Sequence, residues 1–404
     1  MKFAIIRERK NPPDRRVVFS PDALVELKQR YPQIEIKVES SPVRIFSDQE
    51  YRDKGFEVAD DVSDCDVFIG VKEVPVDALV PGKKYFFFSH TIKKQAHNQK
   101  LMHAILEKNI DLYDHETIVN DKHVRLIGFG RYAGIVGAYN GLRAFGVKFE
   151  LFDLPKAETL RGQAEMESRV KRHMLPPIKI VLTGFGKVGK GAKEFLDAVR
   201  IKQVSPEDFL TKRFSDAVYT HIDVLDYNKR KDGKCLDKND FYSFPHLYVC
   251  DFERFTKVAD VFMAGHFYGN GAPSILSREM LRHPDNKVKV VADISCDVGG
   301  PVACTIRSST IADPLYGYLP SEDKEVDVFH PAAVVVMAVD NLPCELPKEA
   351  SEGFGKMFME HVIPAFFNGD KDGVLERALV ASNGHLTPHF SYLEDYANPV
   401  IQEK

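Results

Sequence analysis

The chain has 404 residues, of which 44% are hydrophobic and 28% are charged, and its formal net charge at pH 7 is −4. These values are typical of globular proteins and exclude a disordered or low-complexity chain. The near-balance of charge excludes a strongly basic surface of the kind that binds nucleic acid or anionic membranes. We therefore expect a core-forming protein of two to three domains, without a nucleic-acid or membrane partner.

The N-terminus and the cysteines bear on the cellular location. The apolar start Lys2–Ile6 is shorter than the apolar region of a signal peptide, and no run reaches the roughly 18 apolar residues of a membrane span. The six cysteines are far apart and form no CxxC pair. In a chain of this size they indicate reduced thiols and no zinc site. We expect a cytoplasmic protein without a bound metal.

Apolar runs and helical periods alternate through the first third of the chain. Buried or half-buried strands are expected at Lys2–Ile6, Ile34–Val38, Val67–Val71 and Tyr85–Ser89. Helices are expected at Ser20–Arg30, where Ser20 is a cap, and at Lys100–Asn109. This alternation is typical of an α/β layer fold with a mostly parallel sheet.

The pattern then divides the chain into two domains. Arg131–Leu151 predicts one long helix rich in Gly and Ala, and Pro176–Gly191 restarts the strand–turn–helix order. A second change follows the apolar run Ala332–Val339, where a helical stretch begins. We predict a discontinuous domain of residues 1–138 plus 340–404 and an inserted nucleotide-binding domain of residues 139–339.

The inserted domain contains a glycine-rich turn between a strand and a helix. Ile178–Thr183 is the strand, and the turn residues after it are Gly184, Phe185, Gly186, Lys187, Val188 and Gly189. In this motif the first glycine permits the tight turn, the second lets a pyrophosphate approach and the third lets the helix pack closely. Its place between strand and helix favours a dinucleotide site over an ordinary tight turn.

The acid that binds the adenosine ribose is expected after the next strand. The usual offset falls at Glu207 and Asp208, in a polar helical stretch, so the strand Ala217–Leu225 and its acids Asp223 and Asp226 are better candidates. A carboxylate there favours NAD, because it binds the ribose 2′-OH and repels a 2′-phosphate. The basic run Lys229–Lys231 leaves NADP as the alternative.

Charged and titratable residues follow two neighbouring strands of the first domain. Lys72 and Glu73 come directly after Val67–Val71, and His90 follows Tyr85–Ser89. Parallel strands end at one edge of a sheet, where ligands bind in α/β folds. A lysine and a histidine there are able to position a carbonyl group and carry protons. The same spacing also fits a solvated pair of strand ends.

Further charged groups occur near other strand ends. Arg16 follows the first strand, and Glu116 and Arg125 flank a later one. Arginines that converge suit a substrate with more than one carboxylate, although each alone also fits a surface position. Asp297 and Asp340 follow apolar runs of the inserted domain, where they either face a nicotinamide ring or an amine, or cap a turn.

Taken together, these segments resemble the lysine-forming saccharopine dehydrogenases (lysine–2-oxoglutarate reductases), which are related to alanine dehydrogenase and the nucleotide-binding part of transhydrogenase. The resemblance covers nearly the whole chain. It runs through GVKEVP, FFFSHTIKKQ, LYDHE, RLIGFGRYAGIVGA, TGFGKVGKGA, ADISCDVGG, DNLPCELPKEASEGFG and ASNGHLTPHFSYL. It implies two Rossmann-like domains with mostly parallel sheets, an active-site cleft between them and a nicotinamide cofactor.

The resemblance also implies roles for the strand-end residues. Lys72 and His90 correspond to the family's acid–base pair, and Glu73 and Glu116 to neighbouring acids that tune it. Arg16 and Arg125 correspond to arginines that bind substrate carboxylates. Asp340 corresponds to a residue beside the nicotinamide, and Asp297 to a catalytic aspartate of alanine dehydrogenase.

The implied reaction is the reversible reductive condensation of L-lysine with 2-oxoglutarate. The cofactor stays open, because the segment after the glycine turn resembles NADP-using animal enzymes and the Lys-Glu pair resembles NAD-using fungal ones. One alternative is an alanine dehydrogenase-like enzyme that uses ammonia, although GFGRYAG departs from that branch. The other is a non-catalytic dinucleotide sensor. A homo-oligomer is compatible with the implied reaction and with both alternatives.

Overall fold

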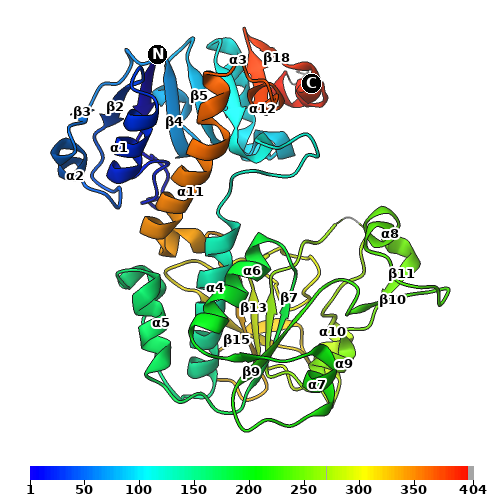
Figure 1. The fold of residues 1–404 in the computed structure, drawn as a ribbon. Coiled ribbons are helices and arrows are strands. Elements are labelled where there is room, and N and C mark those ends of the chain that lie inside the picture. The colour runs from blue at the N-terminus through cyan, green and yellow to red at the C-terminus, as the bar shows by residue number, and fades with distance from the viewer. Residues whose placement is uncertain (270, 399–404) are drawn as a thin grey trace. The chain divides into compact units, whose positions relative to one another are not determined.

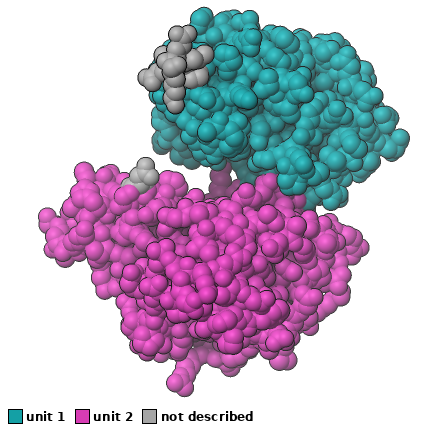
Figure 2. Space-filling view, turned by 180° about the vertical axis from the view of Figure 1, so that it is seen from behind, with its two compact units in different colours: residues 1–129, 347–404 teal, residues 130–346 magenta. Residues whose placement is uncertain are grey.

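Both halves of the sequence fold as α/β layers (Figure 1). The computed structural model of the chain describes residues 1–269 and 271–398. They divide into unit 1, residues 1–129 with 347–398, and unit 2, residues 130–346 (Figure 2). Both boundaries differ from the predicted ones at 138 and 340. The first lies earlier because helix α4 (Gly130–Lys148) packs against α6 (Lys187–Ala198) of unit 2. The second lies later because η7 (Leu342–Glu345) packs on α4.

Over the described residues, unit 1 has an eight-stranded sheet of order β18-β17-β6-β5-β4-β1-β2-β3. The strands from β6 to β3 pair in parallel, whereas β17 and β18 are antiparallel at one edge. The bounds are β1 (Lys2–Ile5), β2 (Glu35–Glu39), β3 (Glu57–Ala59), β4 (Val67–Lys72), β5 (Lys84–Phe88), β6 (Asp111–Asp114), β17 (Leu379–Ser382) and β18 (His385–Leu386).

Helices and two apolar clusters complete unit 1. The Ser20 side chain caps α1 by accepting the Ala23 N–H, as the sequence predicts. One cluster joins β1, β4 and β5 to α1 and α11, and the other packs α3 and α13 on the sheet. The helices are α1 (Pro21–Arg30), α2 (Asp48–Asp53), α3 (Gln99–Glu107), α11 (Pro347–His361), α12 (Val374–Ala378) and α13 (Glu394–Ala397).

Unit 2 has a second sheet of the same kind, of order β15-β14-β16-β13-β12-β7-β9-β8 over the described residues. The strands from β16 to β8 are parallel, and β14 and β15 are antiparallel at one edge. The bounds are β7 (Lys179–Thr183), β8 (Lys202–Gln203), β9 (Val218–Ile222), β12 (Val261–Ala264), β13 (Val290–Asp293), β14 (Leu315–Leu319), β15 (Lys324–Val326) and β16 (Val334–Met337).

The glycines of α4 allow it to pack closely inside unit 2. A Cβ on Gly134 would lie 2.0 Å from the Val188 carbonyl oxygen, and one on Gly137 would lie 2.6 Å from the Ile294 side chain. Further helices of unit 2 include α5 (Gln163–Lys171), α7 (Pro206–Thr211), α9 (Glu253–Thr256) and α10 (Arg278–Arg282). The predicted fold class, two α/β units with mostly parallel sheets, is confirmed. None of the described helices is both long and apolar enough to cross a membrane.

A small structure interrupts unit 2 after β9. It consists of β10 (Asn228–Arg230), α8 (Lys238–Ser243), the turn η6 (Pro245–Leu247) and β11 (Tyr248–Cys250), and we call it the β10–β11 module. The two strands pair with each other in an antiparallel ribbon that is separate from the large sheet. Figure 1 shows the module at one side of unit 2.

Candidate active site

The carboxyl ends of β4, β5 and β6 bring the predicted acid–base residues of unit 1 together. Lys72 ends β4, and His90 and Glu116 follow β5 and β6. The His90 Nε2 lies 4.0 Å from Glu73 Oε2, and its Nδ1 lies 3.9 Å from Glu116 Oε1. The imidazole is thus placed between two carboxylates, with Lys72 close enough to act on its charge.

Burial and neighbouring charge keep His90 neutral. Desolvation and the Lys72 ammonium lower the pKa of His90 to about 4, against the opposing effect of Glu73 and Glu116. The residue has a left-handed backbone, with φ of 56°. A neutral imidazole near pH 7 is able to accept a proton from an ammonium group.

The two carboxylates stay ionised despite their burial. Burial raises the pKa of Glu73, but its own backbone N–H and Lys10, whose Nζ lies 3.1 Å from Glu73 Oε1, lower it below its usual value. Burial likewise opposes the ionisation of Glu116, and Arg125 and Lys93 lower its pKa. Lys93 Nζ and Arg125 Nη2 lie 3.1 and 3.2 Å from Glu116 Oε1. Sequence reasoning missed Lys10 and Lys93.

Arg16 is held differently from Arg125. Its guanidinium is buried, donates to both Asp14 oxygens at 3.0 and 2.6 Å and lies 4.2 Å from the Phe129 ring centroid. Burial opposes the ionisation of Asp14, but Arg16 lowers its pKa to about 2. Arg125 is 42% exposed by side chain. Of the two predicted carboxylate-binding arginines, Arg125 is the more accessible.

Two carboxyl groups, the half-buried Glu8 and the buried Asp114, fix the backbone beneath these side chains. Glu8 accepts the Val71 and Lys72 N–H groups at 2.7 and 2.8 Å. Asp114 accepts the Ser89 and Glu116 N–H groups at 3.1 and 2.7 Å. Burial raises the pKa of Glu8 to about 8 and that of Asp114 to about 6. No local pattern marks Glu8, because it bonds to a strand distant in sequence, whereas Asp114 combines a distant bond to Ser89 with a local one to Glu116.

The glycine turn of unit 2 fits a dinucleotide. Gly184 has φ of 94°, which favours glycine, and a Cβ on Gly189 would lie 1.7 Å from the Gly184 carbonyl oxygen. A Cβ on Gly186 would meet nothing within 4 Å, so the backbone is open to a phosphate at the start of α6. Phe185 is 45% exposed, and its ring packs edge-on against His221.

The structure separates the roles of the two candidate ribose acids. Asp226 caps its own turn, because its carboxylate accepts the Asp223 N–H at 2.8 Å. Asp223 lies directly after β9, and its carboxylate bonds to the Lys238 ammonium. Asp223 is therefore the better placed of the two to meet a ribose. Lys238 was not predicted from the sequence.

Asp297 and Asp340 lie near the ends of neighbouring parallel strands. Asp297 follows β13 and Asp340 follows β16. Burial, together with the charges of Asp293, Asp340 and Asp297, raises the pKa of the Cys296 thiol to about 12. Both side chains are exposed. Among the described residues, no group of three or more His, Cys, Asp or Glu side chains is placed to bind a metal.

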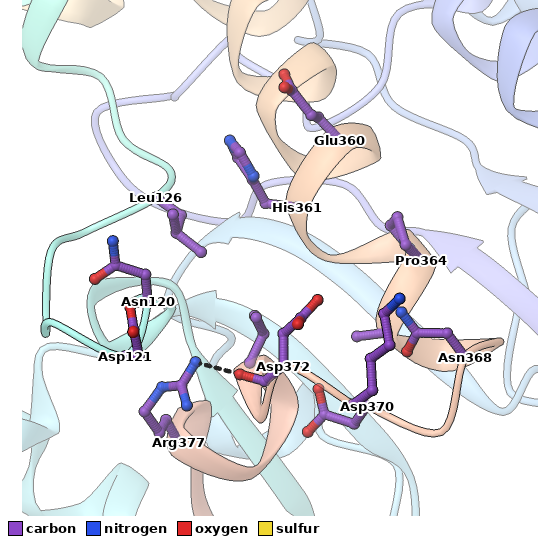
Figure 3. Close-up of a pocket in the computed structure, with 13 residues that line it drawn as sticks. Asn120, Asp121, Leu126, Glu360, His361, Pro364, Asn368, Asp370, Asp372 and Arg377 are labelled. Atoms are coloured by element: carbon purple, nitrogen blue, oxygen red, sulfur yellow. Dashed lines mark hydrogen bonds between the residues drawn. The ribbon is translucent and has the colours of Figure 1, made fainter.

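A cavity of about 540 Å³ in unit 1 lies away from these residues (Figure 3). Loop residues from Asn120 to Leu126 and the segment from Glu360 to Arg377 line it, and none of the predicted site residues does. Its charged groups serve the local backbone: Arg377 donates to the Asp372 carbonyl oxygen at 2.7 Å, and Asp370 accepts the Glu376 N–H at 2.8 Å. These two bonds hold the backbone around the start of α12, which is a structural role.

Comparison with known proteins agrees with this arrangement. Residues 4–136 match the family model "Alanine dehydrogenase/PNT, N-terminal domain", and residues 220–389 match "Alanine dehydrogenase/PNT, C-terminal domain". An alpha-aminoadipic semialdehyde synthase of Arabidopsis thaliana is 30% identical over 96% of this chain, which spans only 41% of that relative. A lysine-forming saccharopine dehydrogenase [NAD(+)] of Yarrowia lipolytica is 24% identical over 81% of this chain and 83% of the relative.

A solved structure shares the fold. An L-alanine dehydrogenase superposes with a TM-score of 0.65 at 17% identity, over 98% of this chain and 100% of the other. The sequence and structural comparisons together account for both units. The chain belongs to the family that carries the alanine dehydrogenase/PNT N- and C-terminal domains, and its curated relatives include alpha-aminoadipic semialdehyde synthases and lysine-forming saccharopine dehydrogenases.

Proposed function

We propose that the chain is an NAD(P)-dependent oxidoreductase of the lysine-forming saccharopine dehydrogenase type. It condenses L-lysine with 2-oxoglutarate and reduces the product to saccharopine, reversibly. The observation that carries this proposal is the cluster of His90, Lys72, Glu73 and Glu116 at one sheet edge, with Arg125 beside it. A binding module without catalysis has no need for a neutral imidazole between two ionised carboxylates.

The chemistry assigns a proton transfer to each member of the pair. His90, neutral near pH 7, accepts a proton from the ε-ammonium of lysine. The free amine attacks the keto carbon of 2-oxoglutarate, a C–N bond forms, and the former carbonyl oxygen takes a proton from Lys72. The attached nitrogen then returns one proton to Lys72, Lys72 passes that proton to the hydroxyl oxygen, and loss of this oxygen as water leaves a protonated imine. When bound, the nicotinamide cofactor supplies the hydride that reduces the imine carbon.

The other predicted residues orient the substrate and the cofactor or affect the protonation of His90. Arg125 binds a substrate carboxylate, whereas the buried Arg16 already binds Asp14 and is not assigned a substrate. Glu73 and Glu116 hold the local charge that affects the protonation of His90. Gly184, Gly186 and Gly189 bind the pyrophosphate, with Phe185, Lys187 and Val188 in the same turn. Asp223 binds the adenosine ribose, and Asp297 and Asp340 border the nicotinamide. NAD is the proposed cofactor, with NADP as the alternative, and the proposed location is the cytoplasm.

Oxidation of NADH, and separately of NADPH, by the purified protein tests this proposal. One mixture contains L-lysine with 2-oxoglutarate, and the other contains ammonia with pyruvate. We expect turnover that depends on lysine. Turnover only with ammonia and pyruvate would assign the chain to an alanine dehydrogenase reaction instead, and cofactor binding without turnover in either mixture would favour the sensor.

A further inference from the structure

The carboxylate that is placed to bind the adenosine ribose is paired with a cation from the β10–β11 module. Asp223 lies directly after β9, the strand that pairs with β7 before the glycine turn, and its side chain is only 12% exposed. The Lys238 ammonium bonds to it from the first residue of α8 and stays 45% exposed. The bond to Asp223 raises the pKa of Lys238, so this ammonium is charged at neutral pH.

The module holds Lys238 in a defined place. The Phe241 side chain is buried in the main apolar cluster of unit 2, and its ring packs edge-on against Tyr248 at 5.1 Å. Asp237 caps α8 by accepting the Asp240 N–H at 2.8 Å, and the Asn228 amide donates to the Val224 carbonyl oxygen at 2.8 Å. These contacts fix the module to the loop after β9, which carries Asp223.

The three basic residues that follow Asp223 most closely in the sequence have other partners than Asp223. Lys229 pairs with Asp251 at 2.6 Å, Arg230 with Asp232 and Asp240, and Lys231 Nζ donates to the His246 carbonyl oxygen at 2.7 Å. The run Lys229–Lys231, which the sequence offers for a 2′-phosphate, is therefore occupied by contacts within the module and its flanks. Lys238 alone among these cations meets the ribose acid.

We infer that Lys238 determines how this site reads the 2′-position of the cofactor's adenosine ribose. A lone carboxylate binds a 2′-OH and repels a 2′-phosphate, whereas this carboxylate is matched by a partly exposed ammonium. Asp223 then binds the 2′-OH of NAD, and Lys238 turns to the 2′-phosphate of NADP. Tyr242, one turn after Lys238 and 47% exposed, lies on the same side of α8 and offers a ring for the adenine. The inference rests on the proposed nucleotide site.

Calorimetric binding of 2′,5′-ADP and of 5′-ADP to the full chain tests it without turnover. We expect the wild-type chain to bind both, and Lys238→Met to weaken 2′,5′-ADP by about 10- to 100-fold while 5′-ADP changes by less than about threefold. Asp223→Asn should change the preference in the opposite direction. Lys229→Met removes an exposed cation of the same module and is the matched control, with both affinities unchanged.

Each other outcome overturns a different statement. Equal losses for both probes in Lys238→Met, or no loss in either, would refute the role of Lys238 and leave the nucleotide site standing. If Lys238→Met does not fold, Lys238→Gln, which keeps a polar partner for Asp223, carries the same expectation. A wild-type chain that binds neither probe would refute both this inference and the dinucleotide site on which the proposed function depends.

Discussion

The two sheets have the same arrangement of parallel strands, yet their carboxyl edges are built from different groups. The edge of unit 1 carries titratable side chains, and the carboxyl groups of Glu8 and Asp114 hold the backbone that presents them. The edge of unit 2 relies on backbone, at a turn where Gly189 admits no side chain. Proton transfer needs tuned side chains, whereas phosphate binding needs open N–H groups, so one architecture serves both tasks.

The largest expected effect tests whether the backbone of the glycine turn in unit 2 binds phosphate. Gly189→Ala places a methyl group where the Gly184 carbonyl oxygen lies, so the start of α6 must move. We expect the binding of 5′-ADP to weaken by more than about 100-fold, measured by calorimetry. Gly186→Ala is the contrast, since its methyl group meets nothing within 4 Å, and it should keep the wild-type melting temperature. Wild-type affinity in Gly189→Ala would show that the turn does not bind phosphate.

The next effect tests the side chains at the sheet edge of unit 1. His90→Ala removes the neutral imidazole, and we expect kcat with lysine and 2-oxoglutarate to fall by about 100-fold or more. Cofactor binding in unit 2 should be unchanged. His97→Ala, an exposed histidine of the same loop, is the control and should keep wild-type turnover. If His90→Ala turned over at the wild-type rate, the acid–base assignment would be wrong.

A smaller effect separates binding from chemistry within unit 1. Arg125→Gln removes the accessible guanidinium beside Glu116. We expect KM for 2-oxoglutarate to rise about tenfold, with kcat within about threefold, because a lost charged hydrogen bond affects binding. Arg52→Gln, exposed on the same unit, serves as the control for the loss of one positive charge. A fall in kcat at constant KM would instead place Arg125 in the proton-transfer step.

The last effect concerns stability rather than binding or turnover, and it reports on Glu8. Its folded pKa is raised from 4.5 to about 8, so its contribution to the free energy of unfolding is complete below about pH 4.5 and is lost as the pH rises to about 8. Glu8→Gln should remove this dependence, which is at most about 1.4 kcal/mol per pH unit, in urea unfolding across that window. The exposed Glu107→Gln should retain the wild-type slope. If the free energy of unfolding depended on pH equally in Glu8→Gln and in the wild type, folding would not raise the pKa of Glu8.

Several parts of both edges were predictable from the sequence. Runs such as Val67–Val71 predict buried strands, and a parallel sheet then places Lys72 and His90 at one edge whatever the loops do. The strand before the glycine turn and the helix after it are confirmed as β7 and α6. These predictions succeeded because hydrophobic period and turn chemistry are local properties.

The residues that sequence reasoning missed share a different property. Glu8 bonds to the end of β4, more than sixty positions away, and Lys238 reaches Asp223 only because Phe241 anchors the module. Lys229, Arg230 and Lys231 stand nearer to Asp223 in the chain, yet their partners lie elsewhere. Proximity in sequence therefore did not predict which cation pairs with Asp223.

The amino-acid sequence thus specified the two α/β units, the order of their strands' apolar runs, the glycine turn and the strand-end acids and bases, because each depends on a short pattern. Tertiary packing decided which of these groups pair. It buried Arg16 against Asp14, left Arg125 accessible, set His90 between two carboxylates and chose Lys238 for Asp223. The physical reason is that pairing and burial arise where distant segments meet, and that meeting is a property of the folded chain.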